Sequence, residues 1–178
     1  TQFLHFQMEQ YILNNYLLNP KPNDIRTPLW MADWIYDLVK QSGMKHNVVL
    51  DPAIGDGELT NNFRQNGSLI VGCDILDSVH QTSDIAIQKQ FQDVTEWVDD
   101  NGNEIPMPDI IVVNPPFNKA PGKQLYPELF LRQIETLFGN GIPVIMFTPM
   151  GMRLNQRLRS SRWRYLRNNW KITSIISL

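Results

Sequence analysis

An amide and two prolines follow an apolar run in the stretch DIIVVNPPFN, residues 109–118. Four β-branched residues lead straight into Asn114, which is typical of a buried strand that ends there. Proline lacks a backbone N–H and fixes φ, so Pro115 and Pro116 stop such a strand abruptly. A stop explains neither the amide before the prolines nor the ring of Phe117 after them. These four residues are therefore candidates for a functional role.

A second candidate group is the stretch VVLDPAIGDGELT, in which Gly55 and Gly57 form a turn after Asp51. Glycine permits φ > 0 and lets the backbone approach a ligand closely. The helix that such a turn opens can offer its first N–H groups to a polar ligand. Thr60 stands where a dinucleotide fingerprint would have its third glycine, so a nicotinamide cofactor is disfavoured. A plain turn that merely needs glycine remains the alternative.

Two further acids continue this pattern. Asp74 ends the apolar run 68–74, where an acid can accept hydrogen bonds from ribose hydroxyls. Asp93 lies near the end of a weaker run, 89–94, and could accept from an adenine amino group. Taken singly, each is more often a surface acid. Together with Asp51 they form a series at three successive predicted strand ends.

The elements that must position these residues alternate along the chain. Strands are predicted over the apolar runs 47–51, 68–74, 89–94, 109–114, 142–148 and 171–178. Helices are predicted between them, including 27–43, with Thr27 as N-cap and Gly43 as C-cap, and 125–141. Continuously apolar strands that alternate with helices indicate a doubly wound α/β fold with a mostly parallel sheet, whose ligand binds at the carboxyl ends of the strands.

Composition is that of a globular protein: 178 residues, 42% hydrophobic and 19% charged. No apolar run approaches the ~20 residues of a membrane span, and the N-terminus lacks a signal-peptide layout. The single cysteine, Cys73, fits a core position in a reducing compartment. We therefore expect a cytoplasmic protein with no membrane partner. The histidines have no metal-ligand spacing, so no metal site is predicted; they are His5, His46 and His80.

The combination of DPAIGDG with a downstream NPPF resembles the S-adenosylmethionine-dependent amino-methyltransferases. More narrowly, it is similar to the adenine-N6 DNA methyltransferases whose cofactor motif precedes the catalytic motif. The likeness runs from about Arg26 to Leu178 and implies a Rossmann-like methyltransferase fold. It also implies that S-adenosylmethionine is the cofactor. The implied cofactor residues are Thr27, Asp51, Pro52, Ala53, Gly55, Gly57, Asp74, Ile75, Asp93, Val94 and Asn114.

The resemblance gives the NPPF residues a catalytic role. The Asn114 side-chain oxygen and the Pro115 carbonyl would each accept one N–H of a purine amino group, freeing its lone pair. Pro115 and Pro116 would keep these acceptors rigid, and Phe117 would stack on the base. Because a base within a duplex cannot reach such a pocket, the adenine would be flipped out of the DNA. Alignment of amine, methyl and sulfur would supply most of the rate.

Other readings of the motif remain open. RNA guanine-amine methyltransferases and protein glutamine methyltransferases use closely similar four-residue motifs. A non-catalytic, cofactor-binding partner subunit is a further alternative. The Asp-Pro opening of DPAIGDG favours the DNA adenine group.

The C-terminal part is basic: seven of the 16 basic residues and none of the 18 acidic ones follow residue 150. Arginine can bind phosphate and the interleaved aromatic residues can stack on bases. An amphipathic helix with its arginines outward is a compatible reading. A loop at 118–124 could close over the substrate. The candidate DNA contacts are Lys119, Lys123, Arg157, Arg159, Arg162 and Arg164.

We expect two regions: a helical N-terminal extension, 1–26, and a catalytic domain, 27–178. The family's sheet would have a seventh strand and a target-recognition domain would follow it. Neither is found here. The catalytic domain is therefore predicted to be C-terminally incomplete, with recognition of DNA in another segment or subunit.

Overall fold

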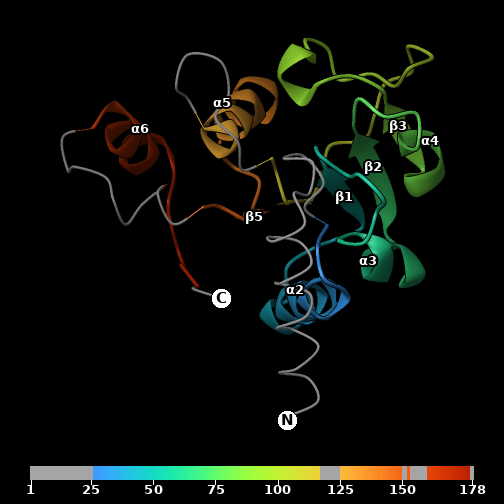
Figure 1. The fold of residues 1–178 in the computed structure, drawn as a ribbon, viewed down its shortest axis with the longest axis horizontal. Coiled ribbons are helices and arrows are strands. Elements are labelled where there is room, and N and C mark those ends of the chain that lie inside the picture. Colours follow the sequence, from blue (N-terminus) through green and yellow to red (C-terminus); the bar gives the residue numbers. More distant parts are fainter. Residues whose placement is uncertain (1–25, 117–124, 150–151, 153–159, 177–178) are drawn as a thin grey trace, which may run out of the picture.

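The computed structural model describes residues 26–116, 125–149, 152 and 160–176. Within these residues the chain forms a parallel five-stranded sheet, in the order β3-β2-β1-β4-β5, flanked by helices (Figure 1). The strands are β1 (Val48–Asp51), β2 (Leu69–Cys73), β3 (Ile85–Ile87), β4 (Ile110–Val113) and β5 (Val144–Met146). The helices are α2 (Leu29–Ser42), α3 (Asn61–Gln65), α4 (Val79–Thr82), the 3-10 helix η1 (Phe91–Asp93), α5 (Tyr126–Phe138) and α6 (Ser161–Asn169). The predicted α/β, Rossmann-like class of fold is confirmed at this level.

Both faces of the sheet are buried, which explains why its strands are continuously apolar. Val49 and Ile110 belong to one hydrophobic cluster, which α2, α3 and α4 cover. Their neighbours in sequence, Leu50 and Ile111, belong to the cluster under α5 and η1. Successive side chains of a strand point to opposite faces, so each central strand contributes to both clusters. Cys73 is fully buried in the second cluster, as expected for a core cysteine.

The helix predicted at 27–43 is α2, and its N-cap lies one residue later than predicted. Pro28, not Thr27, is the N-cap residue of α2, since the Pro28 carbonyl accepts from the N–H groups of Met31 and Ala32. The Thr27 hydroxyl is therefore not used as a cap. Gly43 ends α2 in the left-handed conformation, with φ 68°, as predicted. No described helix is long and apolar enough to cross a membrane.

The third strand was predicted in the wrong place. β3 consists of Ile85–Ile87 and pairs with β2 through Val71↔Ile85 and Cys73↔Ile87. The predicted run 89–94 contains exposed polar residues followed by the turn of η1. The shorter apolar stretch, isoleucine-alanine-isoleucine, pairs with β2 because it can bury a side chain, Ile87, under the second helical layer.

The sixth strand predicted at 171–178 is not seen in its described part. Residues 171–176 have no regular secondary structure, and no described strand pairs with them. Ile172, Ile175 and Ile176 are about half exposed, at 45%, 52% and 52%. With Trp163, part of this segment lines an open hollow of about 440 Å³. A strand needs a neighbour to pair its backbone groups, and a suitable sequence alone does not provide one.

A buried carboxylate joins α5 to α6. Figure 1 shows α6 on the side of the molecule opposite α4. Glu128, 5% exposed, accepts from Arg132 at 2.9 Å and from Arg162 at 2.8 Å. The Arg132 guanidinium also lies over the Tyr165 ring, 3.7 Å from its centroid, and the Tyr165 hydroxyl donates to Glu135. Arg162, predicted to contact DNA, thus already makes a charged contact within the protein.

We predict that Glu128→Ala lowers the free energy of unfolding by roughly 1.5–3 kcal/mol, because hydrogen bonds to a charged group are lost and two guanidinium groups are left together. Urea denaturation measures this change. Glu96→Ala, at an exposed position, is the matched control. Equal stability of the two variants would contradict the proposed importance of this contact.

Candidate functional site

The strand order defines where the site lies. β1 pairs with β2 on one side and with β4 on the other, and all three strands run parallel. The helices after β1 and β2 cover one face of the sheet, whereas α5, after β4, covers the other. The winding therefore reverses between β1 and β4, and ligands of open α/β sheets bind at the carboxyl ends of the strands at such a point. The two sequence motifs follow these two strands.

The turn after β1 requires glycine. Gly55 and Gly57 have φ values of 51° and 78°, in the left-handed region that residues with a Cβ rarely adopt. A Cβ at Gly57 would also lie 3.1 Å from the Thr82 Cβ, whereas one at Gly55 would meet nothing within 4 Å. Backbone conformation thus explains both glycines, and close packing on α4 adds a reason for the second.

Asp74 ties this turn to the end of β2. Its Oδ2 accepts from the Gly55 N–H at 3.0 Å, and its Oδ1 accepts from the Leu76 N–H at 3.0 Å. The next residue, Ile75, is 62% exposed. Each carboxylate oxygen retains a further lone pair for a ligand. The sequence placed Asp74 correctly at a strand end but did not reveal that it holds the glycine turn.

Asp51 is a buried acid at the carboxyl end of β1, only 1% exposed. The pKa of its carboxyl is raised to about 7, chiefly because the group is buried; the hydrogen bond from the Ala53 N–H lowers it, and the nearby Asp74 carboxylate contributes to the rise. That hydrogen bond to Oδ1 is 3.0 Å long. A positively charged ligand nearby would favour the charged form of the Asp51 carboxyl.

Asn114 follows β4 directly, and its side chain contacts Thr27. The Asn114 Nδ2 donates to the Thr27 Oγ1 at 3.1 Å, across 87 residues of sequence. Asn114 is half-buried, Pro115 is buried and Pro116 is half-buried. Phe117 lies outside the described residues. The structure therefore brings the segment before α2 against the predicted catalytic motif.

Arg26 is a residue of this region that sequence reasoning missed. Its guanidinium pairs with Asp56 at 2.8 Å and lies 3.9 Å from Glu58. Both acids belong to the glycine turn, so Arg26 links that turn to the segment before α2. The sequence signal that could have indicated this contact was a basic residue directly before Thr27 and two acidic residues within the motif GDGE.

Two of the predicted cofactor residues follow β3, the strand that pairs with β2. Asp93 is exposed in η1, beyond the end of β3, and Val94 is 2% exposed in the core beneath α5. Pro52 is buried and Ala53 half-buried in the turn after β1. The residues that the structure gathers at the carboxyl ends of β1, β2 and β4 are Thr27, Asp51, Pro52, Ala53, Gly55, Gly57, Asp74, Ile75 and Asn114.

The predicted DNA contacts are only partly described. Arg164 is exposed on α6, and Arg162 is bound to Glu128. Trp163, Tyr165 and Trp170 pack against the α5–α6 contact, which favours the amphipathic-helix reading for the aromatic residues. The remaining candidates lie outside the described residues: Lys119, Lys123, Arg157 and Arg159.

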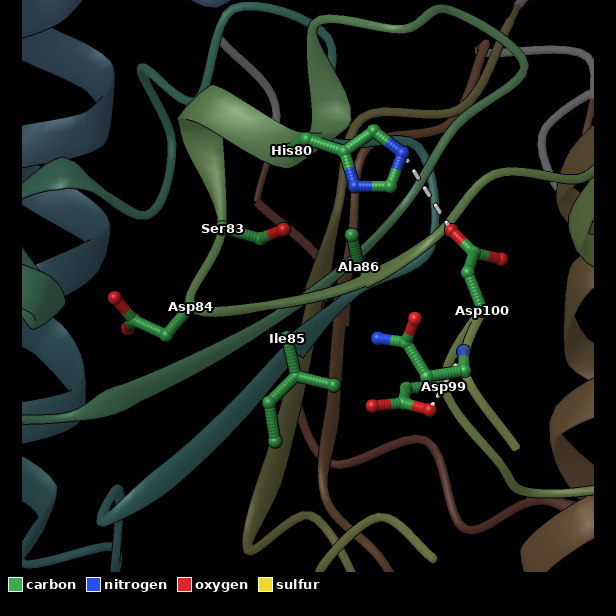
Figure 2. Close-up of a pocket in the computed structure, with 8 residues that line it drawn as sticks. His80, Ser83, Asp84, Ile85, Ala86, Asp99 and Asp100 are labelled. Carbon is green, nitrogen blue, oxygen red and sulfur yellow. Dashed lines mark hydrogen bonds and ion pairs between the residues drawn. The ribbon is translucent and has the colours of Figure 1, made fainter. Parts of the chain in front are cut away.

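A hollow of about 170 Å³ lies at the β3 edge and contains none of the predicted site residues. Figure 2 shows His80 of α4 facing Asp100, 3.6 Å apart, while Asp84 points away from both. The Asp100 carboxylate accepts from the Gln88 N–H, and the Asp100 N–H donates to the Ala86 carbonyl. These contacts cover the outer edge of β3, which would otherwise present unpaired backbone groups. We interpret the residues that line the hollow as a covering of the β3 edge.

No protein-family model matches the chain, and no curated protein is similar enough in sequence to match it. Function therefore has to be inferred from the fold and the site residues.

We predict that Asp51→Asn stabilises the protein without ligand at pH 8. Because folding raises the Asp51 pKa from 3.8 to about 7, the unfolded chain loses this proton more readily. Stability from this group is fully present below the lower pKa and is lost as pH rises through the higher one. Asparagine cannot ionise, and its oxygen can still accept from the Ala53 N–H.

Calorimetric melting from pH 5 to pH 8 measures this effect. The melting temperature of Asp51→Asn, relative to the unchanged protein, should rise across this range. For the control Asp37→Asn, at an exposed position on α2, the difference should stay constant. A pH-independent difference for Asp51→Asn would contradict the raised pKa.

Proposed function

We propose that the protein transfers a methyl group from S-adenosylmethionine to the N6 amino group of an adenine flipped out of DNA. The main observation in support is the meeting of two motifs at one point of the fold. The glycine turn after β1 and the Asn-Pro-Pro segment after β4 lie at the carboxyl ends of paired, parallel strands. A cofactor site and an acceptor site are needed side by side for group transfer.

The residues after β1 and β2 suit the proposed cofactor. Asp51 and Asp74 would face a ligand that carries positive charge, and the turn around Gly55 has open space beside it. The spare lone pairs of Asp74 can accept hydrogen bonds from ribose hydroxyls. When bound, S-adenosylmethionine supplies a methyl group activated by a sulfonium. No strong base is then required of the protein.

Asn114 and Pro115 suit an amino group as acceptor of the methyl. An exocyclic amine conjugated to a purine ring is a poor nucleophile. The Asn114 Oδ1 and the Pro115 carbonyl oxygen each accept a hydrogen bond from one N–H group of this amine. These two hydrogen bonds draw the nitrogen toward tetrahedral geometry. The adjacent prolines restrict the backbone, so these acceptors are positioned before the amine arrives.

The exposed basic side chains of α6 suit the phosphate backbone of DNA. The helix buries Leu166 and turns Arg164 and Arg167 to the surface. Lys171 follows as a further exposed base. Contacts of this kind give affinity without sequence information.

We predict that Asn114→Ala reduces methyl transfer by roughly 100- to 1000-fold, the loss typical of removing one preorganised polar group from a transition state. Binding of S-adenosylmethionine, measured by calorimetry, should change little. Asn140→Ala, in the turn between α5 and β5 at the opposite edge of the sheet, should retain full activity. Equal losses of cofactor binding and transfer would make Asn114 a structural residue.

The product identifies the substrate class. After incubation with DNA, RNA or protein, mass spectrometry should find N6-methyladenine in DNA. Methylguanine in RNA or methylglutamine in protein would instead support one of the related amino-methyltransferase activities. No methylated product with any of the three would contradict the proposed enzymatic function.

A further prediction distinguishes the exposed arginines of α6 from the one that is bound to Glu128. Replacing Arg164 and Arg167 with alanine should weaken duplex binding and flatten its dependence on salt, because fewer counterions are released. Arg162→Ala, whose side chain is 18% exposed and bound to Glu128, should mainly lower the free energy of unfolding. Titrations of labelled duplexes at two salt concentrations measure the first effect. An unchanged salt slope in the double variant would contradict phosphate binding by α6.

A further inference from the structure

One face of the sheet is covered unevenly by helices. α2, α3 and α4 cover this face, and both α3 and α4 pack beside β2, toward the β3 edge. At the other edge of the sheet, no described helix other than α2 is available to cover β5 on this face. Ile145 of β5 and Phe147, which follows it, contact the hydrophobic cluster of this face but are only half-buried. An apolar area beside α2 is thus incompletely covered by the described part of the chain.

The side of α2 that faces away from α3 extends this apolar area. Asp33 accepts from the Asn62 side chain of α3 at 2.6 Å, so one side of α2 faces α3. Trp30, Trp34 and Leu38 follow one another at four-residue spacing along a different side of the helix. Trp30 is 43% exposed, and Trp34 and Leu38 are half-buried. A helix side with three large apolar residues is normally covered by a neighbouring element.

The N-terminal segment, residues 1–18, has the composition of such an element. Ten of its residues are apolar, and Glu9 is its one formally charged residue. Leu4, Met8, Tyr11 and Ile12 have helical spacing, so they would share one face of a helix. The segment lies outside the described residues. A segment with so many apolar side chains is stabilised by a contact that removes them from water.

The connection to α2 is long enough for this segment to reach the apolar area. Residues 19–25 span up to about 24 Å when extended, and the described chain starts at Arg26, shortly before α2. Pro20 and Pro22 disfavour a continuous helix through this connection. As a helix, residues 1–18 would be about 27 Å long, against about 21 Å for the 14 residues of α2. An antiparallel pair of helices with a short connection fits these lengths.

We propose that the N-terminal segment forms a helix that docks beside α2, on the apolar surface made by Trp30, Trp34, Leu38, Ile145 and Phe147. Docking removes apolar side chains of both partners from water and completes the covering of this face of the sheet. The connection is short, so the local concentration of the segment is in the millimolar range, which favours it over a second copy of the chain. The proposal does not depend on the proposed methyl transfer.

The first measurement detects the contact in the full chain. Cys73 is buried, so a nitroxide spin label attaches selectively to a cysteine introduced by Glu9→Cys. The label broadens the NMR signals of nuclei near it. With the isoleucine methyl groups isotope-labelled, the Ile145 signal, assigned by its loss in Ile145→Val, should lose most of its intensity. An Ile145 signal that keeps its intensity would overturn the proposal.

The Ile87 methyl signal, assigned in the same way, is the internal control. β3 lies at the opposite edge of the sheet, roughly 19 Å from β5, and Ile87 belongs to the cluster on the other face. Its intensity should therefore change little. Equal broadening of the Ile87 and Ile145 signals would show that the segment has no preferred place on the protein and would overturn the proposal.

A mixing experiment identifies the chain that supplies the segment. Spin-labelled protein without isotope labels is mixed with isotope-labelled protein that carries no spin label. Broadening of the Ile145 signal in the doubly labelled chain, but not in the mixture, supports docking within one chain. Broadening of equal strength in the mixture would show that a second copy supplies the segment, and would overturn the proposal.

Two substitutions in the spin-labelled chain test the docking face. Ile12→Asp and Gln10→Asp each add one negative charge, but Ile12 lies on the predicted apolar face and Gln10 lies on the opposite side of the helix. Ile12→Asp should restore the Ile145 signal to the intensity of the Ile87 signal, whereas Gln10→Asp should leave it broadened. The other isoleucine signals report whether each variant is folded. Equal effects of the two substitutions would overturn the proposed docking face.

Discussion

The parallel pairing of β1 with β4 is the constraint on which the site depends. The register Val49↔Ile110 and Leu50↔Ile111 joins segments about 60 residues apart in sequence and ends both strands at the same edge of the sheet. A slip of one residue would turn each side chain to the opposite face. Both hydrophobic clusters would then be disrupted, and Asn114 would no longer stand beside the turn after Asp51.

Polar contacts between loops, in addition to the pairing of the strands, position the residues of the candidate site. Asp74 holds the glycine turn to the end of β2, Arg26 holds the same turn to the segment before α2, and Thr27 holds that segment to Asn114. The turns after β1 and β2, the segment after β4 and the segment before α2 are therefore linked to one another by side chains. Loops placed on a rigid scaffold are the usual location of binding residues, and these links restrict how far the loops move independently.

Much of this fold could be predicted from the sequence, because apolar runs and the prolines and glycines that end them are local signals. The strands β1, β2, β4 and β5, the helices α2 and α5, and the left-handed Gly43 all follow from apolar runs, prolines and glycines. β3 could not be placed so easily, since only three residues form it and a longer, more polar run follows. Residues 171–178 have a strand-like pattern, but pairing requires a neighbour that a pattern cannot supply.

The positions of the candidate site residues could be predicted where they depend on neighbouring positions in the sequence, but not where they depend on contacts across the fold. Asp51, the glycines and Asn114 stand in short motifs at strand ends, and the structure brings them together. Arg162 resembled a DNA contact because its sequence neighbours are basic. Its partner, Glu128, is 34 residues away, so only the three-dimensional packing reveals the ion pair.

The division of charge at the site edge gives a physical reason for expecting a cationic ligand. The outer acids of the glycine turn, Asp56 and Glu58, lie against Arg26. For the inner acids, Asp51 and Asp74, the described part of the chain shows backbone N–H partners but no ion pair with a base. Burial makes the charged form of the Asp51 carboxyl unfavourable and the Asp74 carboxylate adds a smaller repulsion, which together raise the Asp51 pKa. A ligand that brings positive charge to these two acids would stabilise their charged forms. The sulfonium and ammonium groups of the proposed cofactor are charges of the required sign.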